Sequence, residues 1–210
     1  MLLVVATRNP RKLAEVKVIP TLFKCTKSYH VQSLDDMKID GEVDEIGTSY
    51  RENAFLKAEY IVSVLSKKYR DFIVVADDSG LEVEGLTWSD GRLQGQPYPG
   101  VDTHQVRARI GSTLGTLRHY RELAGKDQLR LYDCCTLCVI KVVASRPEPP
   151  VYLEARIGGK TAISMTGSDK FDYDLYFVPD SSTMTYGQMM SEEKLQHSAR
   201  GAVLKQLFSM

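Results

Sequence analysis

The sequence predicts an α/β protein with a mixed β-sheet. Strand-like and helix-like segments alternate through the first half of the chain, which favours strands joined by helices. Two long strand-like runs follow later, at residues 131–143 and 151–157, and their closeness favours a paired block. With 210 residues, 43% of them hydrophobic, the chain can bury a sizeable core, so we expect one domain over residues 1–210, compact or divided by a cleft into two lobes.

The chain opens with a strand and then a helix. Residues 2–6 are apolar and predict a buried first strand. Asn9 and Pro10 combine an N-cap residue with a proline at the first helical position. The apolar residues that follow recur at helical spacing and give this helix one apolar face: Leu13, Val16 and Ile19.

A second helix and a second strand follow in the same order. Ser49 and Glu52 have the spacing of a capping box, and apolar residues then continue at helical spacing. Residues 72–76 form an apolar run typical of a strand. We expect a sharp turn at residues 77–80, which end in a glycine, and a short strand at residues 81–84.

The second half of the chain is irregular before it becomes rich in strands. Several glycines and prolines lie within residues 89–103, which we expect to be loop. A helical region should follow at residues 104–123, interrupted at Gly111 and Gly115. Two elements come after the long strands: a short strand at residues 175–178 and a last helix from Ser191 to about Leu207.

Charge and cysteine usage exclude several classes of protein. The chain has 27 basic and 27 acidic residues, so no net field attracts nucleic acid or an anionic membrane. No apolar stretch approaches the roughly 20 residues that span a bilayer, and the apolar N-terminus is too short for a signal peptide. Three of the four cysteines cluster at residues 134–138, which favours buried thiols in a reducing compartment rather than a zinc site. We therefore expect a cytoplasmic protein.

Two adjacent carboxylates, Asp77 and Asp78, come directly after the strand at residues 72–76. In open α/β sheets, ligands bind at the carboxyl ends of the strands. Neighbouring carboxylates repel each other unless a cation or a proton relieves them, and oxygen ligands of this kind suit Mg²⁺. The alternative is a solvated turn in which one aspartate caps a following helix. The pair alone leaves the two interpretations evenly matched.

A junction rich in hydrogen-bond donors lies between the first strand and the first helix, and it consists of Thr7, Arg8, Asn9, Pro10, Arg11 and Lys12. A helix N-terminus presents free amides and a partial positive charge, which suits phosphate. Arg11 and Lys12 add full positive charges. The spacing of a Walker P-loop is absent, and in isolation a capped helix with a solvated basic first turn is the better interpretation.

Three further segments contain residue types that nucleotide binding uses. Glu45 lies in an acidic loop that could supply another carboxylate to the same cation. The run Phe171-Asp172-Tyr173-Asp174 combines rings that can stack on a base with carboxylates that can accept hydrogen bonds. Lys194, Ser198 and Arg200 could reach a phosphate or a base from the last helix. The alternatives are a solvated acidic loop, a packed aromatic loop and a charged helix surface.

Taken in order, these segments resemble the inosine triphosphate pyrophosphatase family, which hydrolyses non-standard purine nucleoside triphosphates. The family motif Ala-Asp-Asp-Ser-Gly-Leu is present unchanged at residues 76–81. Other motifs are matched along the whole chain by Thr7, Asn9 and Lys12; Glu45, Gly47 and Thr48; Glu52, Asn53 and Ala54; Pro99, Gly100 and Val101; Phe171, Asp172, Tyr173 and Asp174; and Glu193, Lys194, Ser198, Ala199 and Arg200. Their common order is more specific than any single motif.

The resemblance implies a long mixed β-sheet flanked by helices, two lobes with an active-site cleft between them, and a homodimer. It implies Mg²⁺-dependent hydrolysis of ITP, dITP or XTP to the monophosphate and pyrophosphate. On this basis Asp78 is the catalytic base, Lys12 also acts in catalysis, and Glu45, Asp77 and Asp78 hold the metal. The phosphates would be bound by Thr7, Arg8, Asn9, Pro10, Arg11, Lys12 and Ser79, and the base and its surroundings by Phe171, Asp172, Tyr173, Asp174, Lys194, Ser198 and Arg200.

The departures from the family pattern gather on the base-recognition side. Ala199 stands where the family has histidine, Asp172 where it has glycine, and Leu175 where it has proline. His197 is close in sequence but should point to a different side of a helix. Two alternatives therefore stay open. The first is a pyrophosphatase with relaxed base preference that also takes standard or pyrimidine triphosphates, and the second is a catalytically weakened nucleotide-binding protein.

Overall fold

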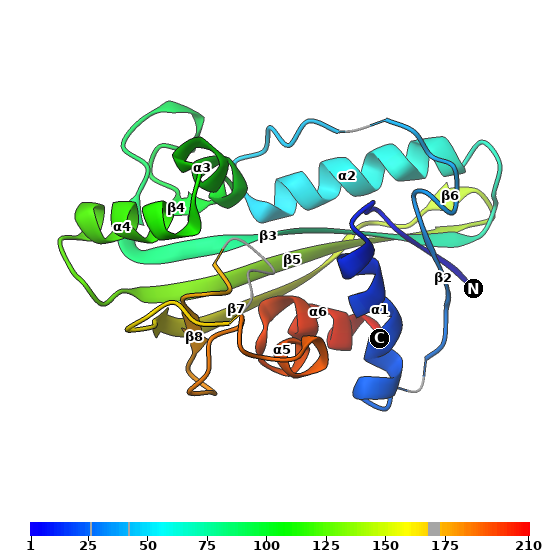
Figure 1. Ribbon diagram of the computed structural model, residues 1–210. Helices are drawn as coiled ribbons and strands as arrows, with labels where there is room; N and C mark the ends of the chain where they lie inside the picture. The colour runs from blue at the N-terminus through cyan, green and yellow to red at the C-terminus, as the bar shows by residue number, and fades with distance from the viewer. Residues whose placement is uncertain (26, 42, 168–172) are drawn as a thin grey trace. The chain divides into compact units, whose positions relative to one another are not determined.

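The computed structural model of the protein describes residues 1–25, 27–41, 43–167 and 173–210 (Figure 1). The chain divides into two compact units, each built from segments that are distant in sequence. Unit 1 comprises Met1–Asp78, Cys135–Glu154 and Gly201–Met210, and unit 2 comprises Ser79–Cys134 and Ala155–Arg200.

Within the described residues, the strands form one eight-stranded mixed sheet, as the sequence predicts. The order is β2-β1-β3-β5-β7-β8, with β4 paired to β3 and β6 paired to β5. β1 runs parallel to β2 and β3, whereas β4, β6 and β8 pair antiparallel with their neighbours. The strands are β1 (Leu2–Val5), β2 (His30–Ser33), β3 (Phe72–Thr87), β4 (Pro97–Gly100), β5 (Arg130–Val143), β6 (Arg146–Pro147), β7 (Val151–Thr161) and β8 (Phe177–Pro179).

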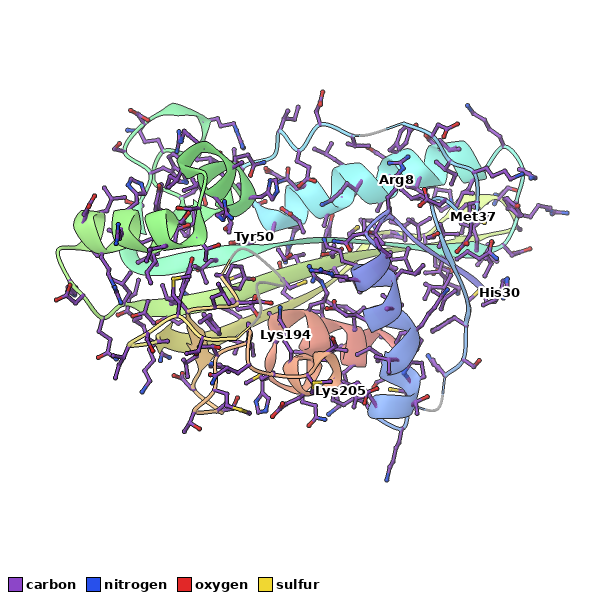
Figure 2. The ribbon with its side chains drawn as sticks, viewed as in Figure 1. Arg8, His30, Met37, Tyr50, Lys194 and Lys205 are labelled. Carbon is purple, nitrogen blue, oxygen red and sulfur yellow. The ribbon has the colours of Figure 1, made fainter. Side chains whose placement is uncertain are left out.

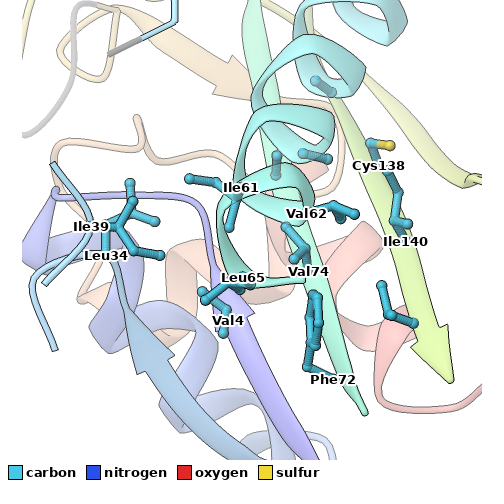
Figure 3. Close-up of a cluster of buried hydrophobic side chains, with 14 residues drawn as sticks. Val4, Leu34, Ile39, Ile61, Val62, Leu65, Phe72, Val74, Cys138 and Ile140 are labelled. Atoms are coloured by element: carbon cyan, nitrogen blue, oxygen red, sulfur yellow. The ribbon is translucent and has the colours of Figure 1, made fainter. Parts of the chain in front are cut away.

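In unit 1, helices lie on both sides of the strands. Figure 1 shows α2 (Tyr50–Leu65) on one side, and α1 (Pro10–Leu22) with the later part of α6 (Ala199–Leu207) on the other. The apolar face of α2 packs on β1, β3 and β5, and Figure 3 shows this buried cluster, which includes Ile61, Val62, Leu65, Val4, Phe72, Val74, Cys138 and Ile140. Because full burial of one aliphatic side chain contributes roughly 1.5–3 kcal/mol, the cluster holds α2 firmly against β3.

Side-chain caps fix where these two helices of unit 1 begin. The side chain of Asn9 accepts a hydrogen bond from the backbone N–H of Arg11 at 2.9 Å. The hydroxyl oxygen of Ser49 accepts one from the N–H of Glu52 at 3.2 Å, and the Glu52 carboxylate accepts one from the N–H of Thr48 at 2.6 Å. Such caps satisfy N–H groups that have no partner inside the helix. The predicted N-caps at Asn9 and Ser49 are confirmed.

Unit 2 contains α3 (Thr103–Ile110), α4 (Thr113–Ala124), α5 (Ser191–His197) and a core rich in aromatic residues. Gly111 ends α3 with a φ of 87°, a conformation that suits glycine. The predicted interruption at Gly115 is wrong, because Ser112 caps α4 by accepting a hydrogen bond from the N–H of Gly115, inside the first turn. Among the described helices, none has both the length and the apolar character that a membrane crossing requires.

Three other boundaries differ from the sequence prediction. Residues 89–103 contain a 3₁₀ turn at Gly91–Leu93 and strand β4, where loop is predicted. The last helix is two helices, because Ser198 adopts an extended conformation between α5 and α6. β8 begins only at Phe177, because the N–H groups of Tyr176 and Phe177 bind the carbonyl oxygen of Tyr173 in a turn.

The predicted turn at residues 77–80 is also wrong, because β3 continues from Phe72 to Thr87. Beyond the acidic pair, Leu81 and Val83 are buried, and β4 pairs with this part of the strand. β1, in contrast, ends at Val5, opposite Val75 of β3. Asp77 and Asp78 therefore lie beyond the carboxyl end of the neighbouring strand β1. The sheet is open beside this pair because β1 ends early, and not because β3 turns.

Candidate active site

The two aspartates of unit 1 face different helices. Successive side chains of an extended strand point to opposite faces of the sheet. Asp77 meets α1, where the Nζ atom of Lys12 lies 2.9 Å from its Oδ2 atom. Asp78 meets α2, through Asn53 and Lys57. Because α1 and α2 lie on different sides of the strands, each carboxylate has its own lysine (Figure 1).

Asp78 is only 6% exposed. Its Oδ2 atom accepts a hydrogen bond from Nδ2 of Asn53 at 3.1 Å, and its Oδ1 atom lies 3.7 Å from Nζ of Lys57. Burial raises the pKa of Asp78 to about 6, and Lys57 and Asn53 oppose this effect only in part. A carboxyl group with this pKa is ionised at neutral pH and is still basic enough to accept a proton, as a general base must.

Lys57 connects Asp78 to Glu45. Its Nζ atom lies 3.4 Å from Oε1 of Glu45 as well as 3.7 Å from Oδ1 of Asp78. Two carboxylates from distant parts of the chain thus approach one positive charge. Mg²⁺ takes one or two carboxylates and completes its shell with water and substrate phosphates, so this pair of donors fits it. Within the residues that the structure describes, no three His, Cys, Asp or Glu side chains gather into a complete metal site.

Asn53 ties the loop that carries Glu45 to Asp78. Its side-chain oxygen accepts a hydrogen bond from the N–H of Gly47 at 2.8 Å, while its amide group donates to Asp78. A Cβ atom at Gly47 would lie 2.6 Å from Oδ1 of Asn53, so only glycine permits this approach. Neither Asn53 nor Lys57 is predicted from the sequence as a catalytic, metal-binding or substrate-binding residue. Their spacing of four on α2, which places both on one helix face, is the signal that could have found them.

A cavity of about 350 Å³ in unit 1 brings several predicted residues together. It is lined by Thr7, Arg8, Lys12, Glu45, Lys57 and Asp77, among others. It therefore joins the junction before α1 to the acidic loop and to β3. The predicted phosphate-binding and metal-binding residues of unit 1 thus include neighbours in space, and Lys57 adds a third cationic side chain to Arg8 and Lys12.

The individual residues of the junction have different surroundings. Thr7 is buried, and its hydroxyl oxygen accepts a hydrogen bond from the N–H of Asn9 at 3.1 Å. Arg8, labelled in Figure 2, donates to the carbonyl oxygens of Ile39 and Gly41, both at 2.8 Å. Its guanidinium thus anchors the segment that follows β2. The exposed residues Asn9, Pro10 and Arg11 form the first turn of α1 and its cap.

The predicted base-recognition residues belong to unit 2, together with Ser79. Lys194 of α5, labelled in Figure 2, donates to both carboxylate oxygens of Asp174 at 2.7 Å. Asp174 is fully buried, and burial lowers the pKa of Lys194 while the Asp174 carboxylate counteracts this. Arg200 donates to the hydroxyl oxygen of Ser79 at 2.8 Å, and Ser198 is buried where α5 ends. Phe171 and Asp172 lie outside the described residues.

Asp133 of β5 is a buried carboxylate of unit 2 that the sequence analysis missed. It is 4% exposed and accepts hydrogen bonds from the hydroxyl groups of Tyr173 and Tyr186 and from the backbone N–H of Ala199. An aspartate inside an apolar strand needs such partners, because an unpaired charge is costly to bury. Its isolated position in the apolar run at residues 131–140 is the signal that could have identified it.

The structure also shows where His197 lies relative to Ala199. The ring of His197 is 2.7 Å from the hydroxyl oxygen of Ser181, in the exposed loop after β8. Ala199 is fully buried, and its N–H binds Asp133. The two residues therefore have different surroundings, which agrees with the expectation that His197 points to another side.

Comparison with known proteins identifies relatives of the whole chain. A sequence model of the Ham1 family matches residues 3–210. A dITP/XTP pyrophosphatase of Clostridium perfringens is 32% identical over 206 residues, which cover 97% of this chain and 94% of the relative. A dITP/XTP pyrophosphatase of Bacillus subtilis is 30% identical over 205 residues, which cover 97% of this chain and 93% of the relative. The structure of the Staphylococcus aureus Ham1 protein has a TM-score of 0.73 and 26% sequence identity, and covers 99% of this chain and 96% of its own.

Proposed function

The chain belongs to the Ham1 family, and on that basis we propose that it hydrolyses non-standard purine nucleoside triphosphates, such as dITP, ITP and XTP, to the monophosphate and pyrophosphate with Mg²⁺. The observation that carries this proposal is the cavity of unit 1, where Thr7 and Lys12 lie beside Glu45 and Asp77. Cationic and carboxylate groups in one cavity suit a phosphate chain together with a metal ion. Residues 1–210 would act as one catalytic domain.

The residues of unit 1 would bind the phosphates and activate water. A triphosphate carries about four negative charges, and fixed cationic groups stabilise such charge most effectively where water is excluded. Lys12 and the N-terminus of α1 supply positive charge for the phosphates. Glu45 and Asp78 would hold Mg²⁺, whose chemistry there is to neutralise charge on the phosphates. Asp77 would complete the metal set or orient Lys12, to which it is already paired.

Asp78 would act as the general base. A water molecule that attacks a phosphorus atom must lose a proton, and the carboxylate of Asp78 can accept it. Without a metal ion, burial raises the pKa of Asp78 to about 6, which makes this carboxylate more basic than an exposed one. The bond that breaks joins that phosphorus atom to the bridging oxygen, which leaves with pyrophosphate. Asn53 holds the acceptor carboxylate in place through its amide group.

The residues of unit 2 would recognise the base. Asp174 and Lys194 form a buried pair of opposite charge, and Arg200 follows the start of α6. A site that hydrogen-bonds polar groups of its substrate rejects an analogue that leaves those groups unpaired. Ala199 cannot donate a side-chain hydrogen bond to a base. This observation favours a second candidate, a pyrophosphatase with relaxed base preference.

The test is pyrophosphate release from ITP, XTP, dUTP, ATP and GTP in the presence of Mg²⁺, with the wild type, Asp78→Asn and the control Asp40→Asn. Asp40 is an exposed aspartate of the same unit. We expect turnover of ITP and XTP that is lost in Asp78→Asn and retained in Asp40→Asn. Equal turnover of all five substrates would support the relaxed base preference. Binding of ITP without any product would refute the enzymatic proposal and leave a nucleotide-binding protein.

A homodimer in the cytoplasm completes the proposal. The family relationship supports the dimer, and the free cysteines support the location. All four cysteines are free thiols, and Cys134, Cys135 and Cys138 are buried. Free thiols persist in reducing compartments. Sedimentation of the purified protein tests the dimer, and a mass equal to 23.6 kDa would refute it.

A further inference from the structure

Asp133 accepts hydrogen bonds at both carboxylate oxygens. Its Oδ1 atom accepts one from the hydroxyl group of Tyr173 at 2.7 Å. Its Oδ2 atom accepts one from the backbone N–H of Ala199 at 2.9 Å and lies 3.1 Å from the hydroxyl oxygen of Tyr186. All four residues belong to unit 2. One buried carboxylate thus contacts three segments that lie 40, 53 and 66 residues further along the chain.

Tyr173 is itself a predicted substrate-binding residue, and both Tyr173 and Ala199 are direct neighbours of further ones. Tyr173 precedes Asp174, which pairs with Lys194, and Ala199 precedes Arg200, which pairs with Ser79. The hydroxyl oxygen of Tyr186 also lies 2.9 Å from the carbonyl oxygen of His197, where α5 ends. The contacts of Asp133 therefore reach the segments on either side of the break between the two last helices.

The position of Asp133 is also favourable for its charge. It binds the first N–H of α6, and a negative charge at the N-terminus of a helix is stabilised by the helix dipole. Ser198, the residue before α6, is extended and buried, so the chain changes direction at this point. A break between two helices needs partners for the freed backbone groups, and Asp133 supplies one of them.

We propose that Asp133 is a positioning residue for base recognition, which fixes Asp174 through Tyr173 and Arg200 through the N-terminus of α6. This inference rests on the proposed function, in which those two residues bind the base. Asp133 would not itself touch the substrate, because its carboxylate is occupied by Tyr173, Tyr186 and Ala199. Its effect on the reaction would be on substrate affinity and base preference rather than on the chemical step.

The test compares Tyr173→Phe and Asp133→Asn with the control Tyr132→Phe. Tyr132 is the neighbour of Asp133 on β5, and its hydroxyl group donates to Glu84 at 2.6 Å, so the control removes a similar tyrosine–carboxylate hydrogen bond on the other face of the strand. For each protein, kcat and KM are measured with ITP and with GTP, and thermal unfolding is measured in parallel.

For Tyr173→Phe we expect KM for ITP to rise about tenfold, the loss that one hydrogen bond to a charged group explains, with kcat within about twofold of the wild type. The preference for ITP over GTP, as the ratio of kcat/KM values, should fall by a similar factor. A purely structural loss would lower kcat for both substrates equally and leave this ratio unchanged. Asp133→Asn replaces one carboxylate oxygen by an NH2 group that cannot accept, so it must lose the bond from Tyr173 or the bonds from Tyr186 and Ala199, and its effect should be in the same direction.

Two outcomes would overturn the inference. The first is an unchanged KM and an unchanged preference in Asp133→Asn with an active wild type, even if Tyr173→Phe changes them, because Tyr173 is itself a predicted base-recognition residue. The second is a change of the same size in Tyr132→Phe. Failure of the proposed function is a different result, because the wild type itself would then release no pyrophosphate from any of the nucleotides.

Discussion

Replacing Asp78 with asparagine should make the metal-free protein more stable at neutral and alkaline pH while it abolishes turnover. The substitution preserves the size of the side chain and retains an acceptor for the amide group of Asn53. It removes a negative charge that is 6% exposed. An ionised carboxylate in such surroundings costs free energy unless a cation compensates it.

The magnitude follows from the pKa of this group. Burial is the main cause that raises the pKa of Asp78 from its ordinary value of 3.8 to about 6, with smaller contributions from the negative charges of Glu45 and Asp77, and the opposing effects of Lys57 and Asn53 are already included. Since one pKa unit corresponds to about 1.4 kcal/mol, ionisation costs the folded state about 3 kcal/mol. A raised pKa means that the folded protein binds the proton more tightly than the unfolded chain. The stabilising contribution of protonated Asp78 to the free energy of unfolding is therefore fully present below about pH 4 and is lost as the pH rises through about 6.

Urea denaturation with EDTA at about pH 4.5 and about pH 8 measures this effect. We expect a free energy of unfolding that is higher in Asp78→Asn than in the wild type by about 2–3 kcal/mol at the higher pH, and a much smaller difference at the lower pH. Added Mg²⁺ should stabilise the wild type more than the variant, because binding to the folded state alone raises stability.

Asp77→Asn is the matched control. Its side chain is almost as buried as that of Asp78, but its carboxylate lies 2.9 Å from Nζ of Lys12, compared with 3.7 Å between Asp78 and Lys57, so we expect no stabilisation on its replacement. The reasoning would be refuted by an Asp78→Asn protein that is less stable than the wild type at about pH 8 without metal. In that case the attraction between Asp78 and Lys57 would outweigh the cost of burial.

Three further predictions concern the packing and the thiols. In Gly47→Ala the added Cβ would lie 2.6 Å from Oδ1 of Asn53 and displace the loop that carries Glu45. The substitution should therefore lower the free energy of unfolding in urea by about 1–3 kcal/mol and raise the Mg²⁺ concentration required for half activity. Leu65→Ala, in the cluster beneath α2, should cost about 2–5 kcal/mol in the same assay, and activity per folded molecule should be retained. A thiol reagent should label Cys25 first, because Cys134, Cys135 and Cys138 are buried and burial raises the pKa of Cys138 to about 12. Rapid labelling of all four thiols in the folded protein would contradict this prediction.

Elements were predicted correctly where the signal lies in a few neighbouring residues, as in a helix cap or an apolar run. The caps at Asn9 and Ser49 and the apolar run at residues 72–76 each contain their own evidence, and the structure confirms them. The turn at residues 77–80 could not be rejected in this way. Whether a strand continues past two aspartates depends on its neighbours, here the end of β1 and the pairing of β4, which are distant in sequence.

In the candidate site, too, the sequence predicted residues that belong to a local motif and missed those that depend on contacts between distant segments. The motifs predicted Asp78 and Lys12, and the structure adds Lys57, whose spacing of four from Asn53 places both on one face of α2 but does not show that this face meets Asp78. Asp133 is the clearest omission, because its three partners lie at residues 173, 186 and 199. No spacing rule connects these positions, since the sheet and the break between α5 and α6 bring them together.

The opposite orientation of Asp77 and Asp78 places an unusual constraint on the length of β3. Because side chains alternate along a strand, deleting or inserting one residue before the pair would exchange the two faces. An insertion would bring Asp77 to the place of Asp78, facing Asn53 and Lys57, and a deletion would bring Asp78 to the place of Asp77, facing Lys12. In both cases the side chains beyond the change would be inverted relative to those before it. Many single substitutions in this strand should be tolerated better than a change of one residue in its length. In any collection of variants of this protein, we expect insertions and deletions to be absent from residues 72–78 even where several side chains are interchangeable.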